Sequence, residues 1–212
     1  MKRPIIYLVT VAALMTLLSG CFPKKAGKSL AHFHVEAPAV GTVAPNFQLA
    51  DLSGDIVELK DLLGEKPIVL QLGSHTCPVY RYRRFGMRKL YADYKDKAHF
   101  LLVYTLEAHP VGAINPYVDR EWVSSFNYIT NTLIEKHSNY AGRKDIANFS
   151  VNKLEVPYPV VIDNMNDAVW KAYGRAPSAA FVIDQSGVIA LQLPWVDPKP
   201  IANTLDELLL SN

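Results

Sequence analysis

The chain has 212 residues, of which 50% are hydrophobic and 20% charged, and it contains two cysteines. This composition is too polar for a protein with several membrane spans and too apolar for a disordered chain. Two cysteines exclude a disulfide-rich scaffold and a cysteine-rich zinc module, and the length fits one sizeable domain. The formal net charge of +2 raises the question of whether the protein binds nucleic acid or a membrane surface.

The first twenty residues have the pattern of a secretion signal. Lys2 and Arg3 form a short basic start, and residues 4–18 are an uncharged apolar run. The run is too short for a membrane span, which needs about twenty residues, and is typical of a signal peptide. It ends in Leu-Ser-Gly-Cys at 18–21, which resembles the lipobox of bacterial lipoproteins, where the cysteine is acylated and the preceding peptide removed. The alternative is an uncleaved membrane anchor with a chance cysteine.

Removal of residues 1–20 would leave a mature chain that begins at Cys21 with equal numbers of basic and acidic residues. The hint of nucleic-acid binding then disappears. Acyl chains on Cys21 would hold the protein on a membrane of the bacterial cell envelope, facing the periplasm. Phe22, rather than aspartate, follows the cysteine, and the sorting rule of such lipoproteins then favours the outer membrane. Residues 21–41 are predicted to be a lipidated tether, and residues 42–212 the folded domain.

The predicted elements of the domain alternate strands with helices. The helical crossover between the first two sheet strands requires that they be parallel, whereas the last hairpin is antiparallel. We therefore expect an α/β, thioredoxin-like fold, a mixed central sheet flanked by helices, with a peroxiredoxin-like N-terminal hairpin. In chain order, we predict a hairpin of 47–50 and 56–59, a strand at 67–73, a helix from 78 to about 95 with Tyr82, Phe85, Leu90 and Tyr94 on one side, a strand at 99–106, two helices within 121–154 broken near 139–142, a strand at 158–163, a short helix at 166–173, a hairpin of 179–184 and 188–193, and a closing helix at 198–210.

Cys77 is the one thiol that remains if Cys21 is acylated. It lies in Gly-Ser-His-Thr-Cys-Pro, residues 73–78, between a predicted buried strand and a helix that proline opens. The helix dipole and the basic residues that follow, with no acid before Asp93, favour the thiolate, which is the nucleophilic form. The alternatives are a buried structural cysteine and, for the basic residues, a solvated helix face. The wall of the candidate site is assigned to Ser74, His75, Thr76 and Pro78.

Glu107 and His109 follow the next predicted strand. Because the carboxyl ends of parallel strands lie at one edge of a sheet, this pair is expected near Cys77. Residues two apart in extended backbone face the same side. A carboxylate can orient and charge an imidazole, which then protonates a leaving group. On spacing alone, ordinary surface polarity is an equal alternative.

These motifs together resemble those of the iodothyronine deiodinase family. The segment at 73–78 and Tyr-Thr-Leu-Glu-Ala-His-Pro at 104–110 resemble the family's selenocysteine–proline and Glu-Ala-His motifs. The resemblance extends over residues 43–193 and implies a thioredoxin fold. It is supported by His137 with Arg143, by Pro-Val-Val-Ile-Asp-Asn-Met-Asn at 159–166, and by Tyr-Gly-Arg-Ala-Pro at 173–177.

The resemblance also implies roles for individual residues. Cys77 takes the selenocysteine position, and Pro177 the position of the proline that faces the thiol, commonly a cis proline. The implied function is a membrane-tethered, single-cysteine thiol oxidoreductase that attacks a soft electrophile, a halogenated aromatic or a peroxide, and is restored by an external thiol. No cofactor, metal or nucleic-acid partner is assigned, and the oligomeric state is left open. The proton relay is assigned to Glu107 and His109, with His137 as a second donor.

The chain also departs from related patterns. Cysteine replaces selenocysteine, His75 stands where many deiodinases carry an auxiliary cysteine, and residues 111–122 replace an expected Asp-Gly-Trp. The peroxiredoxin signature is half met, since Leu70 and Ser74 replace its proline and threonine, and no second cysteine completes Cys-x-x-Cys or Cys-x-x-x-Cys. Two other functions stay open, a non-catalytic envelope module and a site for a soft metal such as copper. The candidate metal ligands are His75, Cys77, Glu107 and His109.

Overall fold

A five-stranded mixed sheet organises the fold of the computed structural model, which describes residues 30, 32–118 and 120–210. The predicted signal peptide and Cys21 lie outside the described residues. The sheet has the order β5-β4-β3-β6-β7, in which β3, β4 and β5 pair in parallel and β6 pairs antiparallel with both of its neighbours, β3 and β7. The strands are β3 (Ile68–Gly73), β4 (His99–Tyr104), β5 (Val160–Ile162), β6 (Ala180–Ile183) and β7 (Ile189–Leu193), and β1 (Gln48–Ala50) and β2 (Ile56–Glu58) form a separate antiparallel hairpin.

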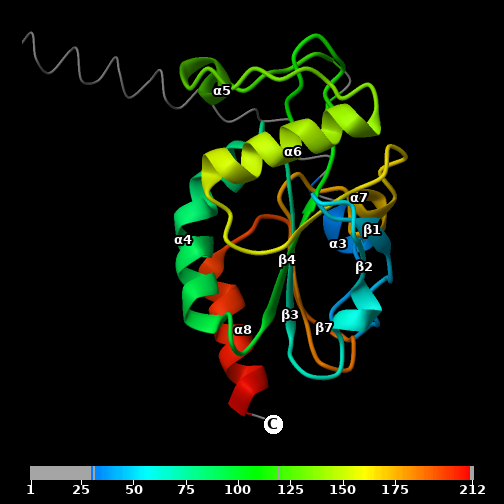
Figure 1. Cartoon of the computed structure of the whole chain (residues 1–212), viewed down its shortest axis with the longest axis vertical. Helices are drawn as coiled ribbons and strands as arrows, with labels where there is room; N and C mark the ends of the chain where they lie inside the picture. The colour runs from blue at the N-terminus through cyan, green and yellow to red at the C-terminus, as the bar shows by residue number, and fades with distance from the viewer. Residues whose placement is uncertain (1–29, 31, 119, 211–212) are drawn as a thin grey trace, which may run out of the picture.

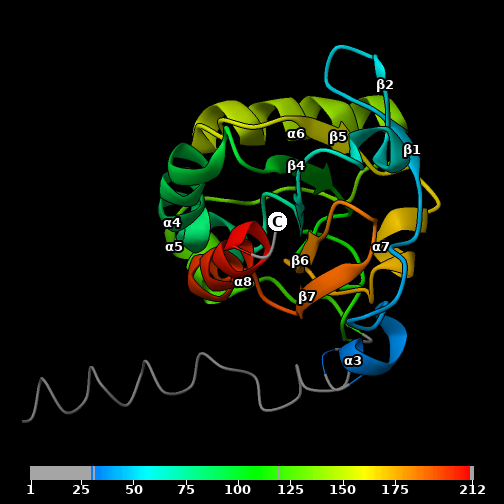
Figure 2. The same cartoon turned by 90° about the horizontal axis from the view of Figure 1, so that it is seen from below.

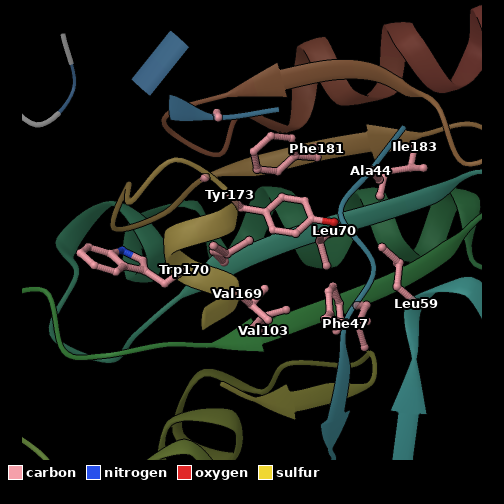
Figure 3. Packing of buried hydrophobic residues seen from close by; sticks show 14 of the residues in the cluster. Ala44, Phe47, Leu59, Leu70, Val103, Val169, Trp170, Tyr173, Phe181 and Ile183 are labelled. Atoms are coloured by element: carbon pink, nitrogen blue, oxygen red, sulfur yellow. The ribbon is translucent and has the colours of Figure 1, made fainter. Parts of the chain in front are cut away.

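Helices cover both faces of the sheet, which confirms the expected thioredoxin-like α/β arrangement (Figures 1 and 2). Val69 and Leu70, neighbours on β3, pack into different apolar clusters, because successive side chains of a strand point to opposite faces. Figure 3 shows the cluster on the Leu70 side. One face is covered by α4 (Pro78–Tyr94), α6 (Tyr140–Leu154) and α8 (Pro198–Leu210), and the other by α3 (Phe33–Glu36) and α7 (Ala168–Ala172); the remaining helices are η2 (Leu59–Leu62) and α5 (Ser125–Ile129).

Local signals in the sequence position β3 and α4, which flank Cys77. Every residue of β3 is buried, as expected for a continuous apolar strand at the centre of a sheet. Pro78 occupies the first turn of α4, where its missing N–H costs no hydrogen bond. Gly73 ends β3 under the ring of Tyr80, where a Cβ atom would come within 2.7 Å of that ring. The strand therefore passes closely under the first turn of α4.

The two helices predicted within 121–154 are present, and the second, α6, begins at Tyr140, near the predicted break, but the first is much shorter than predicted. The first helix, α5, is a single short turn capped by Ser124, whose side chain accepts a hydrogen bond from the Asn127 backbone. It ends before Asn131, which has a positive φ of 48°. Thr130 and Thr132 then bond to the Arg81 side chain and hold the chain in an irregular path. A tertiary interaction therefore occupies the part of the segment where the first predicted helix was expected to continue.

The prediction for the buried side of α4 is also wrong in part. Tyr82 and Phe85 are 73% and 62% exposed, whereas Tyr80 and Arg81 are buried. Leu90 is buried as expected. The hydrophobic pattern could not predict that Arg81 would be buried, because its burial depends on hydrogen-bond acceptors in a distant segment. The buried side of the helix is therefore rotated away from Tyr82 and Phe85.

The predicted tether begins to pack against the domain well before residue 41. Phe33 on α3 is fully buried and contacts the Phe181 ring at a centroid distance of 6.1 Å. Gly174, with a φ of +85°, lies so close to this helix that a Cβ atom there would come within 2.6 Å of Ala37. The described part of the segment is therefore a portion of the folded domain, because its apolar side chains complete the core. None of the described helices is long and apolar enough to cross a membrane.

The packing of α3 generates a stability prediction. Phe33→Ala is expected to reduce the free energy of unfolding by about 3 kcal/mol, the usual cost of deleting a buried aromatic ring. Chemical denaturation monitored by circular dichroism measures this. Val35→Ala, on the same helix but 82% exposed, is the matched control and should change stability little. Equal midpoints for the two variants would contradict the docking of α3.

Candidate functional site

Cys77 lies at the junction of the central strand β3 and helix α4. It is the N-cap residue of α4, and its backbone N–H donates to the Ser74 carbonyl at 3.1 Å. The side chain is only 1% exposed. Burial raises the pKa of the thiol to about 11, although the backbone N–H groups of Tyr80 and Val79 and the charge of Arg81 oppose this shift. The sequence-based expectation of a lowered thiol pKa is therefore wrong, because desolvation outweighs the helix terminus and the nearby cation.

Glu107 is the centre of the hydrogen-bond network beside Cys77. Its carboxylate accepts bonds from the backbone N–H and the hydroxyl of Thr76 at 2.8 and 2.6 Å. The Tyr104 hydroxyl donates to its other oxygen. His137 Nε2 lies 3.3 Å from that same oxygen, close enough for an ion pair when the ring is protonated, though without hydrogen-bond geometry. The carboxylate thus joins the loop before Cys77, the end of β4 and the segment before α6.

The environment of Glu107 keeps the buried carboxylate ionised. Its side chain is 2% exposed, and burial alone would raise its pKa. The contacts with His137, Thr76 and Tyr104 outweigh desolvation, so that the pKa lies below its ordinary value. A carboxylate that accepts several hydrogen bonds is stabilised in its charged form. Glu107 is therefore a fixed negative charge at neutral pH, while the pKa of the Tyr104 hydroxyl, raised mainly by burial, keeps that group protonated.

His109 joins the same network through Thr76, whose hydroxyl accepts a hydrogen bond from the His109 backbone at 3.0 Å. Its ring lies 3.2 Å from the Asn115 amide and packs edge-on against Trp122 at 4.5 Å between centroids. Burial lowers the pKa of His109 to about 4, so the ring is uncharged at neutral pH. The expectation that Glu107 charges His109 is therefore not met. The imidazole that lies against Glu107 is that of His137.

The remaining wall residues are also tied to the network. Ser74 accepts a hydrogen bond from the Ala108 backbone at 3.1 Å, and the His75 backbone donates to the Tyr104 hydroxyl at 3.1 Å. The His75 ring faces the Ser150 hydroxyl of α6 at 2.9 Å. Pro177 is buried beside the end of β3, where Leu72 bonds to the Ala179 carbonyl. The expected cis proline is absent: the described residues contain no cis peptide bond, and the turn is made by Gly174 and Arg175, which have positive φ.

Several residues of the site were not assigned from the sequence. Tyr104 was quoted only as part of a motif, although a hydroxyl at the end of a fully buried strand is a signal that it has a polar partner. Arg81 was one of several basic residues with no distinguishing mark except its position four residues after Cys77. Asn115 and Asn127 lie in irregular segments, and no sequence pattern identifies them as buried hydrogen-bond partners.

The described residues give no support for a soft-metal site. They contain no group of three or more His, Cys, Asp or Glu side chains arranged to hold a metal ion. The four candidate ligands are instead engaged as hydrogen-bond partners or buried separately, with His75 on Ser150 and His109 on Asn115.

The lowered pKa of His109 generates a prediction about stability and pH. The unfolded chain takes up a proton at this residue near pH 6.5, whereas the folded protein does so only near pH 4. Stability should therefore fall as the pH decreases from about 6.5 to 4. The free energy of unfolding, measured with denaturant at several pH values in this range, should fall less steeply with decreasing pH in His109→Gln than in the wild type. His34→Gln, at an exposed histidine, is the control, and equal slopes for all three proteins would refute the assignment.

Known proteins with similar sequences are iodothyronine deiodinases. The family model for iodothyronine deiodinase matches residues 14–201. The chain is 28% identical over 172 residues to type I iodothyronine deiodinase of Xenopus laevis, covering 79% of this chain and 63% of that protein. It is 33% identical over 152 residues to thyroxine 5-deiodinase of Gallus gallus, covering 71% and 54%. The chain thus spans little more than half the length of the curated relatives it matches.

Solved structures confirm the fold. A putative thiol:disulfide interchange protein DsbE from Chlorobium tepidum matches with a TM-score of 0.55 and 20% identity, covering 82% of this chain and 98% of that one. A secreted disulfide oxidoreductase of Mycobacterium tuberculosis matches with a TM-score of 0.53 and 14% identity, covering 76% and 96%. At these identities the likeness concerns the thioredoxin-like fold alone. Given the match of the family model over most of the sequence, the chain belongs to the iodothyronine deiodinase family.

Proposed function

We propose that the protein is a thiol-dependent oxidoreductase in which Cys77 is the nucleophile and the Glu107 network supplies the proton. The observation that carries the proposal is the continuous network from Thr76, the neighbour of the thiol, through Glu107 to Tyr104 and His137. Such an arrangement couples a nucleophile to a proton donor in a site from which water is excluded.

The reaction that fits these groups is attack of the Cys77 thiolate on a soft electrophile. With a halogenated aromatic, an S–halogen bond forms, the carbon–halogen bond breaks, and the ring carbon takes up a proton. With a peroxide, an S–O bond forms, the O–O bond breaks, and the departing oxygen takes the proton. An external thiol then displaces halide or water to give a mixed disulfide, and a second thiol releases Cys77 in reduced form.

His137 is the proposed proton carrier of this reaction. The pKa of His109 is lowered to about 4, so its imidazole is not a cationic proton donor at neutral pH. His137 Nε2 lies 3.3 Å from the Glu107 carboxylate, within ion-pair distance when the ring is protonated. His109 then acts as a neutral wall of the site, held by Asn115 and Trp122.

Turnover by site variants tests the proposal. The purified protein is incubated with a small thiol and either an iodinated phenol or an organic hydroperoxide. Release of iodide, or loss of the hydroperoxide, is then followed. Cys77→Ser should abolish turnover, and Glu107→Gln or His137→Gln should lower it by about 100-fold, the scale of general acid catalysis. His34→Gln should match the wild type. Wild-type turnover by Cys77→Ser would exclude the proposed nucleophile.

We also propose that Cys21 is lipidated and anchors the protein in the bacterial cell envelope. The support is the order of a basic start, an apolar run and Leu-Ser-Gly-Cys in residues 1–21. Docking of α3 against the core leaves only the residues before it to act as the tether.

Metabolic labelling tests the anchor. Expression of the full chain in a Gram-negative host with a labelled fatty acid should give a labelled protein in the membrane fraction. Cys21→Ser should remove the label and retain the leader, whereas Cys77→Ser should be labelled normally. Equal labelling of Cys21→Ser and the wild type would contradict the anchor.

A further inference from the structure

Arg81 is a buried cation in the wall of the Cys77 site. It lies on the first turn of α4, and its backbone N–H donates to the Cys77 carbonyl at 3.2 Å. The residue is only 7% exposed. Other basic residues of α4 reach carboxylates near the surface, as Arg83 does with Asp197 and Arg88 with Glu155. Arg81 instead points its guanidinium inward, onto the segment that contains α5.

The hydrogen bonds of this guanidinium all go to neutral oxygens. One nitrogen donates to the hydroxyls of Thr130, at 3.0 Å, and Thr132, and another donates to the side-chain carbonyl of Asn127. The remaining nitrogen, Nε, is buried and has no hydrogen-bond partner. Within the described residues, no carboxylate forms an ion pair with Arg81. A buried charge without a paired opposite charge is costly, so its retention needs an explanation.

The Arg81 contacts also fasten the α5 segment to the loop that carries the thiol. Asn127, which accepts from Arg81, is fully buried and donates through its amide to the Thr76 carbonyl at 2.8 Å. The chain of contacts therefore runs from Cys77 through Arg81 and Asn127 back to Thr76, and encloses the loop that carries the thiol. The Arg81 guanidinium additionally lies over the Phe126 ring, 5.0 Å from its centroid.

We propose that Arg81 is the positioning residue of the Cys77 site, which holds residues 124–132 against the loop that carries the thiol and supplies the positive charge opposite which the thiolate forms. This inference rests on the proposed function only in taking Cys77 as the reactive group. It explains why the guanidinium is kept among neutral hydrogen-bond acceptors: the anions that act on it are the Cys77 thiolate, when it forms, and the Glu107 carboxylate. A planar fork with several donors suits this double task, whereas a lysine could supply only the charge.

The charges around Cys77 are consistent with this role. Arg81 of α4 lowers the thiol pKa and Glu107, after β4, raises it. The buried hydroxyls of Tyr80 on α4 and Tyr117 in the 111–122 segment also couple to the thiol, and both stay protonated because burial raises their pKa values. Arg81 is therefore the one cation among the groups that face Cys77 in the described chain.

The test compares Arg81→Lys with Arg81→Met, because both lose the hydrogen-bonded fork and only one loses the charge. The pH dependence of Cys77 alkylation is measured with neutral iodoacetamide and with anionic iodoacetate. At neutral pH, Arg81→Met should react at least about tenfold more slowly than Arg81→Lys, which corresponds to a thiol pKa about one unit higher. The loss should be larger with iodoacetate. Arg83→Met, on the same helix at the surface, should match the wild type.

Hydrogen exchange tests the second part of the role. The Thr132 amide, which donates to the Asn127 carbonyl at 2.8 Å, should exchange faster in both Arg81 variants. Thr132→Val removes one hydrogen-bond acceptor of Arg81 and keeps the Arg81 charge. It should speed alkylation of Cys77 without raising the thiol pKa. This variant tests the positioning role if Arg81→Met does not fold.

Two results would overturn the inference. The first is that Cys77 alkylation has the same pH profile in Arg81→Lys and in Arg81→Met, or in Arg81→Gln if Arg81→Met does not fold. The second is that the Thr132 amide exchanges at an unchanged rate in the Arg81 variants. These measurements need no substrate. They can therefore contradict the role of Arg81 while loss of turnover in Cys77→Ser still supports the proposed function, and they can support it while the proposed function fails.

Discussion

The interaction on which the site depends is the burial of the Glu107 carboxylate. A charge in the interior is stable only if hydrogen bonds and opposite charges replace the water it loses. Here the replacements come from three parts of the chain: Thr76 before α4, Tyr104 at the end of β4, and His137 before α6. Satisfying this one carboxylate therefore fixes the loop that carries Cys77 and the segment that leads to α6.

The same enclosure has a consequence for the thiol. Excluding water strengthens every charge interaction inside the site, but it also raises the pKa of the Cys77 thiol. The exclusion of water thus favours the protonated thiol over the reactive thiolate. Arg81 acts on this balance in two ways, through its charge, which opposes the raised pKa of the thiol, and through its hydrogen bonds to residues 127, 130 and 132.

Much of the fold follows from local pattern, whereas the site follows only in part. The apolar run of β3 and the proline that opens α4 predict the strand, the turn and the position of Cys77. The motif Glu-Ala-His places Glu107 near the thiol because parallel strands end at one edge. The sequence cannot show, however, that His137 rather than His109 meets the carboxylate, because that depends on how a long irregular segment folds back.

The errors have a common physical cause. Arg81 was indistinguishable from the exposed arginines of α4, since helical periodicity ranks it as polar and its acceptors, Thr130 and Thr132, lie about fifty residues later in the chain. Those same bonds hold the chain in an irregular path where the first of the two helices predicted within 121–154 was expected to continue. Phe33 was placed in a tether because the segment around it is short and irregular, and only the tertiary structure supplies its apolar neighbours. Interactions between distant segments decided each case.

The most direct test of the account is to trap the oxidised intermediate on Cys77. The reduced protein is given one equivalent of hydroperoxide or iodinated phenol without external thiol, in the presence of dimedone, and is examined by peptide mass spectrometry. The account predicts a dimedone adduct on the peptide that contains Cys77, which disappears when a small thiol is added first. Consumption of either electrophile with Cys77 left unmodified would contradict it.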